Sequence, residues 1–250
     1  MTMIYATLMF IFGALMTSFY HVIAVRIPNQ ESIKGRSHCD ACHHQLRWMD
    51  IIPIFGYLIN KGKCHYCKSK IPICHLFIEL LGGLIFMTSF LIYGFTLEFI
   101  IVIVMVTVFM VESISDIKYN IVIDRIWMIG LVPLVVIRII ENSFFTHLLS
   151  AAILFTLLYL TAFISQKITK KEALGGGDVK LFIFIGFLVT YQLGILTLFL
   201  ASLLGLIYGM IKYRDKNNGI PLVPFIFIAT IIVYFYGQDF VNWYFGLLGM

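Results

Sequence analysis

Long apolar stretches separated by short polar ones dominate this chain. The stretches run for about 20 residues, the length that an α-helix needs to cross the hydrocarbon core of a bilayer. They do not show the short alternating segments of a transmembrane barrel. The sequence therefore predicts an all-α polytopic membrane protein with about eight transmembrane helices. The expected spans are 3–25, 74–93, 97–113, 121–140, 144–165, 178–190, 194–211 and 221–236.

The division between the sixth and seventh spans follows from length. Leu181 to Ile211 contains no Asp, Glu, Lys or Arg. At a rise of about 1.5 Å per residue, one helix would overshoot a hydrocarbon core of about 30 Å. We expect the break at Tyr191-Gln192-Leu193-Gly194, which would leave a short sixth span.

The distribution of charged residues predicts which side of the membrane each loop lies on. With 60% hydrophobic and 12% charged residues, the chain is far more apolar than a soluble domain. Its Lys and Arg residues lie in the odd-numbered loops, and Arg138 alone falls on the opposite face. The positive-inside rule predicts that these loops are cytoplasmic and both termini outside. The net charge of +5 is modest and is explained by topology, so no nucleic-acid partner is expected.

The first loop carries two CxxC pairs, Cys39 with Cys42 and Cys64 with Cys67. Two such pairs at this separation are typical of a four-thiolate zinc site. Four protein ligands leave no position for water, so the predicted Zn²⁺ is structural. A membrane thiol oxidoreductase also carries paired CxxC motifs, but persistent disulfides are rare in the cytoplasm.

Three glycines, Gly175, Gly176 and Gly177, lead directly into Asp178 at the start of an apolar run. An acid at the mouth of a membrane segment is costly and suggests function. Glycines carry no side chain that would keep another backbone away, so they could form a substrate-approach loop. The plain alternative is a flexible loop followed by a charge that the helix dipole favours.

Asp116 lies in a short polar turn, 115–120, on the same predicted membrane face as Asp178. Two carboxylates brought close together cannot easily both ionise, so one retains a proton. Such a pair can activate water with one member and protonate the leaving group with the other. Asp116 and Asp178 are therefore the candidate catalytic residues.

Other charged residues are candidates for supporting roles. Glu112 precedes Asp116 by one helical turn. Asp124 could also assist, although we favour a plain interfacial charge beside Arg125. Lys180 follows Asp178 closely. Glu79, inside the second span, is expected to pair with a cation of the first loop.

These residues resemble the type 4 prepilin leader peptidases, membrane aspartic proteases of the GxGD type. The resemblance covers nearly the whole chain, and its ordered combination of segments is specific. The matching segments are Ser18–Ile23, Arg26–Pro28, Ser37–Cys42, Leu46–Trp48, Asp50–Pro53, Gly62–Cys67, Asp116, Ile123–Asp124, Leu174–Lys180 and Ile220–Phe225. Thr17, His21, Val25 and Ile123 depart from the family's usual residues, but neither proposed catalytic acid does.

The resemblance implies an endopeptidase that removes the short leader from type 4 prepilins, or from pilin-like competence and secretion precursors. Cleavage would occur at the cytoplasmic face of the bacterial plasma (inner) membrane. Many members also methylate the new N-terminus with S-adenosylmethionine. The implied organisation is a first transmembrane helix (1–25), a cytoplasmic zinc-binding loop domain (26–73) and a transmembrane aspartic peptidase domain (74–250).

Two interpretations from other classes remain open. One is a zinc-stapled transporter whose Asp residues carry ions, although spans 144–165 and 194–211 are nearly bare of the polar groups it would need. The other is the thiol oxidoreductase, which stoichiometric zinc would exclude.

Overall fold

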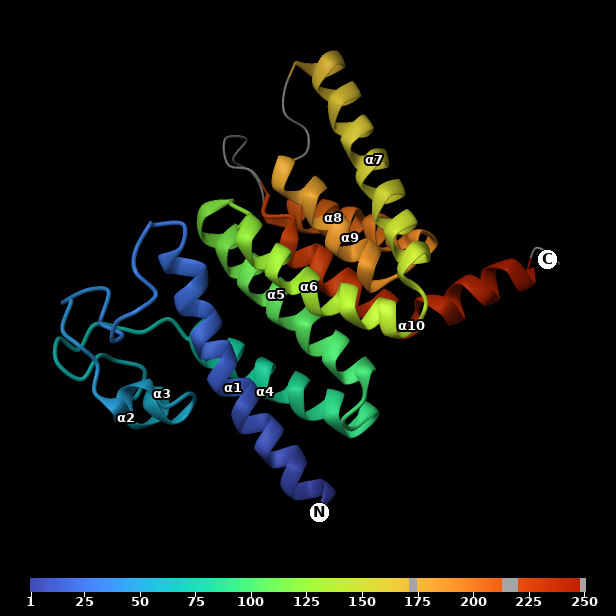
Figure 1. Ribbon diagram of the computed structural model, residues 1–250. Coiled ribbons are helices and arrows are strands. Elements are labelled where there is room, and N and C mark those ends of the chain that lie inside the picture. The colour runs from blue at the N-terminus through green and yellow to red at the C-terminus, as the bar shows by residue number, and fades with distance from the viewer. Residues whose placement is uncertain (171–174, 213–219, 248–250) are drawn as a thin grey trace. The chain divides into compact units, whose positions relative to one another are not determined.

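The computed structural model describes residues 1–170, 175–212 and 220–247 (Figure 1). Apart from two isolated β-bridges, the regular structure of these residues is helical, which confirms the all-α prediction. Eight helices correspond to the expected spans: α1 (Thr2–Arg26), α4 (Cys74–Tyr93), α5 (Leu97–Tyr119), α6 (Asp124–Ile140), α7 (Phe144–Thr169), α8 (Gly176–Leu188), α9 (Tyr191–Lys212) and α10 (Val223–Leu247). Two short helices, α2 (Trp48–Ile51) and α3 (Phe55–Ile59), lie in the first loop.

Six helices among the described residues are long and apolar enough to cross a membrane, namely α1, α4, α5, α7, α9 and α10. The other two expected spans, α6 and α8, are shorter. The chain is therefore a multi-pass membrane protein. It forms two compact units, Met1–Ile103 and Val104–Met250.

In the first unit, α1 packs along α4 through glycines. A Cβ on Gly82 would overlap the side chain of Thr17, and a Cβ on Gly83 would overlap that of Phe10. Small residues at these positions let two membrane helices approach closely.

In the second unit, α8 is the central element. From Leu181 to Leu188 it is apolar on all sides, and it contacts α6, α7, α9 and α10 (Figure 1). A helix of this kind belongs inside a protein. Phe184 of α8 meets Phe109 of α5 edge to face at 5.9 Å, and Phe109 stacks on Phe227 of α10 at 5.5 Å. The helix that carries Asp178 is thus fixed by the core.

The end of α5 differs from the prediction. The expected polar turn at 115–120 is helical as far as Tyr119, so Asp116 lies on a helix rather than in a loop. Asn120, with φ of 53°, follows the helix, and its N–H donates to the carbonyl of Asp116 (2.8 Å). An asparagine in the left-handed conformation is a common helix end.

The break between α8 and α9 also lies earlier than predicted, at Val189 and Thr190 rather than at 191–194. Ser150 of α7 explains the difference, because its Oγ accepts the N–H of Tyr191 (3.1 Å). A hydroxyl from another helix thereby satisfies one of the free N–H groups with which a helix begins.

The C-terminal end of α8 is closed by a cation. Arg138 of α6 donates to the carbonyls of Phe187 (3.0 Å) and Leu188 (2.7 Å), and it pairs with Glu141 (2.7 Å). Helix ends leave carbonyls without partners, and buried ones require a donor. The basic residue that lay outside the predicted charge pattern therefore has a structural role.

Candidate active site

Asp116 is buried near the end of α5, at 6% exposure. Its Oδ2 accepts the backbone N–H of Val223 (2.9 Å), the first residue of α10. The N–H groups at a helix start carry partial positive charge and favour a carboxylate. This bond fixes one candidate acid between two helices that are distant in the sequence.

Asp178 is half-buried in the first turn of α8. Its carboxylate is hydrogen-bonded to the backbone of Gly175, the N-cap residue. A carboxylate three residues after the N-cap is a common partner for the cap N–H. A Cβ on Gly175 would lie 3.0 Å from Oδ2 of Asp178, so this glycine leaves room for the carboxylate itself.

The other two glycines have different surroundings. A Cβ on Gly177 would lie 2.7 Å from the Cβ of Val122, in the segment between α5 and α6. A Cβ on Gly176 would meet none of the described residues within 4 Å. Gly177 therefore permits close packing, and Gly176 leaves open space beside Asp178.

Two side chains of α5 hold the segment that Gly177 contacts. Glu112, which is fully buried, accepts the N–H of Ile123 on Oε2 (2.7 Å). Ser115 donates to the carbonyl of Ile121 (2.8 Å). Oε1 of Glu112 has no hydrogen-bond partner among the described residues. Glu112 thus acts on the start of α8 through the 121–123 segment.

Asp124 and Lys180 form an ion pair at 2.7 Å, with both side chains 48% exposed. The pair joins the first residue of α6 to the second turn of α8. Asp124 also accepts the indole N–H of Trp127 (3.3 Å). The cation paired with Asp124 is therefore Lys180.

Asp116 and Asp178 both lie in the second unit. They are close enough for their charges to repel one another. A single proton shared by the two carboxylates relieves such repulsion, as in other carboxylate pairs. The arrangement can hold one acid as a base and the other as a proton donor.

The four predicted metal ligands form a cluster in the first unit. The Sγ atoms of Cys39, Cys42, Cys64 and Cys67 all lie within 4.8 Å of one another, and those of Cys39 and Cys67 are 3.8 Å apart. Tetrahedral zinc with Zn–S bonds of about 2.3 Å requires sulfurs about 3.8 Å apart. The cluster can therefore hold a metal ion of this size.

Both CxxC pairs have the same local structure. Each lies in a turn closed by an isolated β-bridge, His38 with Gln45 and Lys63 with Lys70. The backbone N–H of Cys42 lowers the pKa of the Cys39 thiol to about 6, and the hydroxyl of Ser69 lowers the pKa of Cys67, whereas burial and the neighbouring thiols raise the pKa of Cys42 to about 11. Thiolates are the form that binds metal.

Glu79 of α4 does not pair with a cation as the sequence suggested. Its Oε2 accepts the backbone N–H of Ile54 (2.7 Å), and the hydroxyl of Ser18 is a second partner. Backbone and hydroxyl donors thus satisfy a carboxyl group inside a membrane helix.

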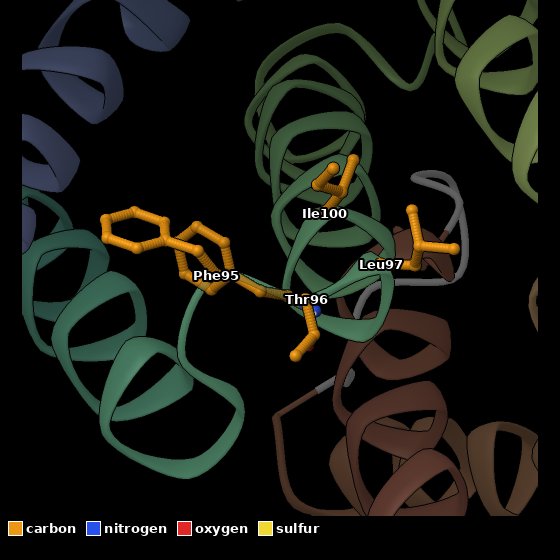
Figure 2. Close-up of a pocket in the computed structure, with 5 residues that line it drawn as sticks. Phe95, Thr96, Leu97 and Ile100 are labelled. Carbon is orange, nitrogen blue, oxygen red and sulfur yellow. The ribbon is translucent and has the colours of Figure 1, made fainter.

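A hollow of about 420 Å³ lies where α5 begins, in the first unit (Figure 2). Its lining is apolar except for one hydroxyl, and consists of Phe95, Thr96, Leu97, Phe99 and Ile100. Hydrolysis by carboxylates needs acids, and this lining has none. The candidate active site is therefore not here.

Comparison with known proteins decides the family. The family model for the bacterial peptidase A24 N-terminal domain matches residues 11–93, and that for the type IV leader peptidase family matches residues 100–210. A Bacillus subtilis (strain 168) protein named prepilin leader peptidase/N-methyltransferase is 31% identical over 245 residues, covering 95% of this chain and 97% of that protein. The chain belongs to the type IV leader peptidase family.

Other proteins similar to this chain carry the same name as the Bacillus subtilis protein. The Vibrio cholerae serotype O1 (El Tor Inaba N16961) protein is 25% identical over 256 residues, covering 94% of this chain and 98% of its own. The Myxococcus xanthus (DK1622) protein is 27% identical over 221 residues, covering 87% and 66%. No solved structure matches the chain. The family predicted from the motifs is confirmed. The match to the N-terminal domain model, 11–93, contains the cysteine cluster, and the match to the leader peptidase model, 100–210, contains Asp116 and Asp178.

Proposed function

We propose that this protein is a membrane aspartic endopeptidase that removes the leader from type 4 prepilins or pilin-like competence and secretion precursors, with Asp116 and Asp178 as its catalytic pair. The juxtaposition of the two acids supports the proposal most directly. They lie in one unit, each is held by backbone groups, and their charges interact. The relatives' name supplies the substrate class.

The proposed reaction needs only the two carboxylates and one water. The ionised member takes a proton from the water as its oxygen attacks the peptide carbonyl carbon. The protonated member donates to the carbonyl oxygen, which gives a tetrahedral diol. Collapse of the diol breaks the C–N bond, and a proton passes to the leaving amine. The pair ends as it began, with one proton between two acids.

Open space beside Gly176 suits the approach of an extended substrate backbone to Asp178. A pilin-like precursor presents a cleavage site next to an apolar helix. Because peptide bonds inside a helix are shielded by their own hydrogen bonds, cleavage requires a locally extended segment. The absence of a side chain at Gly176, two residues before Asp178, leaves room for that segment.

Conversion of each acid to its amide tests the pair. Asp116→Asn and Asp178→Asn should each abolish cleavage of a pilin-like precursor by the reconstituted protein. The double variant should lose little more, because residues that act as a unit are not additive. Asp239→Asn, at an exposed acid of α10, is the matched control. Near wild-type cleavage by Asp178→Asn would overturn the mechanism.

The cysteine cluster is proposed to bind one structural Zn²⁺. Cys39→Ser should lower the metal content of the purified protein to near zero, whereas Cys74→Ser, at the fifth cysteine and outside the cluster, should retain it. Metal binding to such a site contributes to folding. Full zinc loading of Cys39→Ser would refute the four-thiolate site. One zinc per chain would exclude the oxidoreductase interpretation.

The same proposal assigns the 26–73 loop domain and the active site to the cytoplasm and both termini to the outside. Cysteine variants at Ser143 and Asn242 should react with an impermeant thiol reagent on intact cells, and one at Ser69 should not. The reverse pattern would mean that the topology is inverted.

The proposed peptidase domain is 74–250.

The second activity in the relatives' name is N-methylation, for which S-adenosylmethionine is the methyl donor that the family resemblance implies. The sequence contains no GxGxxG run, and no group of described residues can be assigned to that cofactor. The second activity therefore rests on the relatives' name. Transfer of labelled methyl groups to a precleaved precursor tests it separately from Asp116 and Asp178.

A further inference from the structure

The first loop contains a segment with large apolar side chains on its outside. We call residues 47–60, which include α2 and α3, the α2–α3 corner. Its most exposed apolar side chains are Trp48 at 64%, Phe55 at 62%, Leu58 at 56% and Ile59 at 63%. Single exposed apolar residues are ordinary, but a concentration of them in a short segment marks an interaction surface.

The polar side chains of the corner pair with one another around Asp50. The side chain of Asp50 is only 5% exposed. It accepts hydrogen bonds from the backbone N–H, Nε and Nη2 of Arg47 (3.1 Å each) and from Nδ2 of Asn60 (2.8 Å). Asn60 also donates to the carbonyl of Gly56 (2.9 Å). Polar groups paired within the segment and apolar groups turned outward suit surroundings without water.

The corner is attached to α4 through Glu79, a residue within that helix rather than at its end. Ile54 is the central residue of a tight turn in which Phe55 N–H donates to the carbonyl of Pro53 (2.7 Å), with φ of 66° at Ile54. This turn is rare and strained for a β-branched residue. It presents the Ile54 N–H to Oε2 of Glu79 at 2.7 Å.

Glu79 is the sixth residue of α4, so it lies about 7.5 Å along the helix from Cys74. Figure 1 draws α2 and α3 alongside the α1 and α4 pair rather than beyond its end. Since α4 is apolar enough to cross the membrane, the corner lies at the depth of its first turns. That depth corresponds to the boundary between headgroups and acyl chains.

Charge follows directly after the apolar part. Lys61 and Lys63 are exposed and lie two and four residues after Ile59, and Lys68 and Lys70 are exposed further on. Basic residues beside a membrane helix attract the anionic lipids of the cytoplasmic leaflet. Trp and Phe with flanking Lys are the composition of segments that lie in the interface.

We propose that the α2–α3 corner is an interfacial membrane anchor, inserted beside α1 and α4 into a leaflet that contains anionic lipid. Trp48, Phe55 and Ile59 would contact acyl chains, and Lys61 and Lys63 would contact phosphate groups. The lipid surface is the occupant that the geometry favours, because α1 and α4 tether both ends of the loop to the bilayer. The anchor holds the cysteine cluster at the membrane surface and does not depend on catalysis by the acids.

Fluorescence of a single tryptophan tests the anchor in the full-length protein. Trp127→Phe and Trp243→Phe together leave Trp48 as the sole tryptophan. The protein is reconstituted in vesicles of phosphatidylcholine and phosphatidylglycerol, with bromine atoms on the acyl chains either near the headgroup or near the chain end. We expect strong quenching by the bromines near the headgroup, weaker quenching by the deep ones, and little quenching by aqueous acrylamide.

Two matched proteins complete the experiment. In a tryptophan-free background, Phe55→Trp should reproduce the behaviour of Trp48, which covers the case in which one variant misfolds. Tyr66→Trp, at an exposed position beside Cys67, should respond to acrylamide and not to brominated lipid. Zinc content, measured on every variant, reports the fold of the loop.

Two results would overturn the proposal. Quenching of Trp48 and of Phe55→Trp by acrylamide, as at Tyr66→Trp, would mean that the corner lies in water. Protection of both from acrylamide and from brominated lipid would mean that a protein surface covers it, whether another part of this chain or a substrate. Neither result would bear on the aspartic mechanism, which has its own readout in precursor cleavage.

Discussion

Gly177 of α8 lies directly against Val122, so that a Cβ on the glycine would come within 2.7 Å of the Cβ of the valine. This contact joins the helix that begins beside Asp178 to the segment that follows the helix of Asp116. The 121–123 segment is itself held by Glu112 and Ser115. The position of α8 against the 121–123 segment therefore depends on the absence of a side chain at Gly177.

Gly177→Ala should lower the rate of precursor cleavage strongly, because the added methyl must displace Val122 or the start of α8. Misplacement of a reacting group by about 1 Å can cost on the order of 10²-fold in rate. Gly176→Ala is the matched control, since its methyl would meet no described residue within 4 Å and helix propensity changes equally. Equal rates for the two variants would show that the contact does not position the acids.

Asp124→Asn should be much milder than either catalytic substitution. Its ion pair with Lys180 is half-exposed on both sides, and such pairs contribute about 0.2–1 kcal/mol. A loss of about fivefold or less in cleavage rate is expected, since 1 kcal/mol corresponds to about that factor. Lys180→Met should have a similar effect, and the exchanged pair, Asp124→Lys with Lys180→Asp, should recover part of it. Complete inactivation by Asp124→Asn would instead make it a catalytic residue.

Arg138→Met should destabilise the second unit. The substitution leaves the carbonyls of Phe187 and Leu188 buried without their donor, at a cost of about 2–3 kcal/mol. Thermal unfolding in detergent should show a lower Tm. Arg125→Met, at an exposed arginine of the same helix, should leave Tm nearly unchanged. An unchanged Tm for Arg138→Met would mean that α8 does not need this cap.

Asp50 should give the loop a pH-dependent stability. Hydrogen bonds from Arg47 lower the pKa of Asp50 to about 2, against about 3.9 in an unfolded chain. A lowered pKa in the folded state stabilises above the unfolded value, and this stabilisation is lost as pH falls through the folded value. The stability difference between the wild-type protein and Asp50→Asn should thus be constant above about pH 4 and shrink toward pH 2. Metal loss at low pH affects both proteins and cancels in the comparison. A difference that does not change with pH would contradict the ionic role of Asp50.

The lengths of the apolar stretches and the short motifs predicted most helices and the candidate site residues. The span at 74–93 agrees with α4 residue for residue, because Pro72 stands just before it and Gly94, with φ of 61°, ends it. The four cysteines of the cluster were singled out because the two residues of each CxxC pair are close in the sequence, and the structure brings the two pairs together. Asp116 and Asp178 were singled out by their positions beside membrane segments.

What the sequence did not reveal depends on contacts between distant residues. Val223 holds Asp116, and Arg138 holds the end of α8, across separations that leave no periodic signal. Glu79 was expected to pair with a cation, but its partner is the backbone N–H of Ile54. Backbone donors are present at every position, so a sequence cannot indicate which of them a side chain uses.

Because Arg138 holds one end of α8 and Gly177 contacts Val122 at the other, the number of residues between them is fixed. Insertion of a single residue would rotate the start of the helix by about 100° and advance it by about 1.5 Å relative to its far end. Asp178 would then turn away from Asp116 although every amino acid of the active site was still present. Family members should therefore differ freely in the apolar residues of α8 and yet share its length.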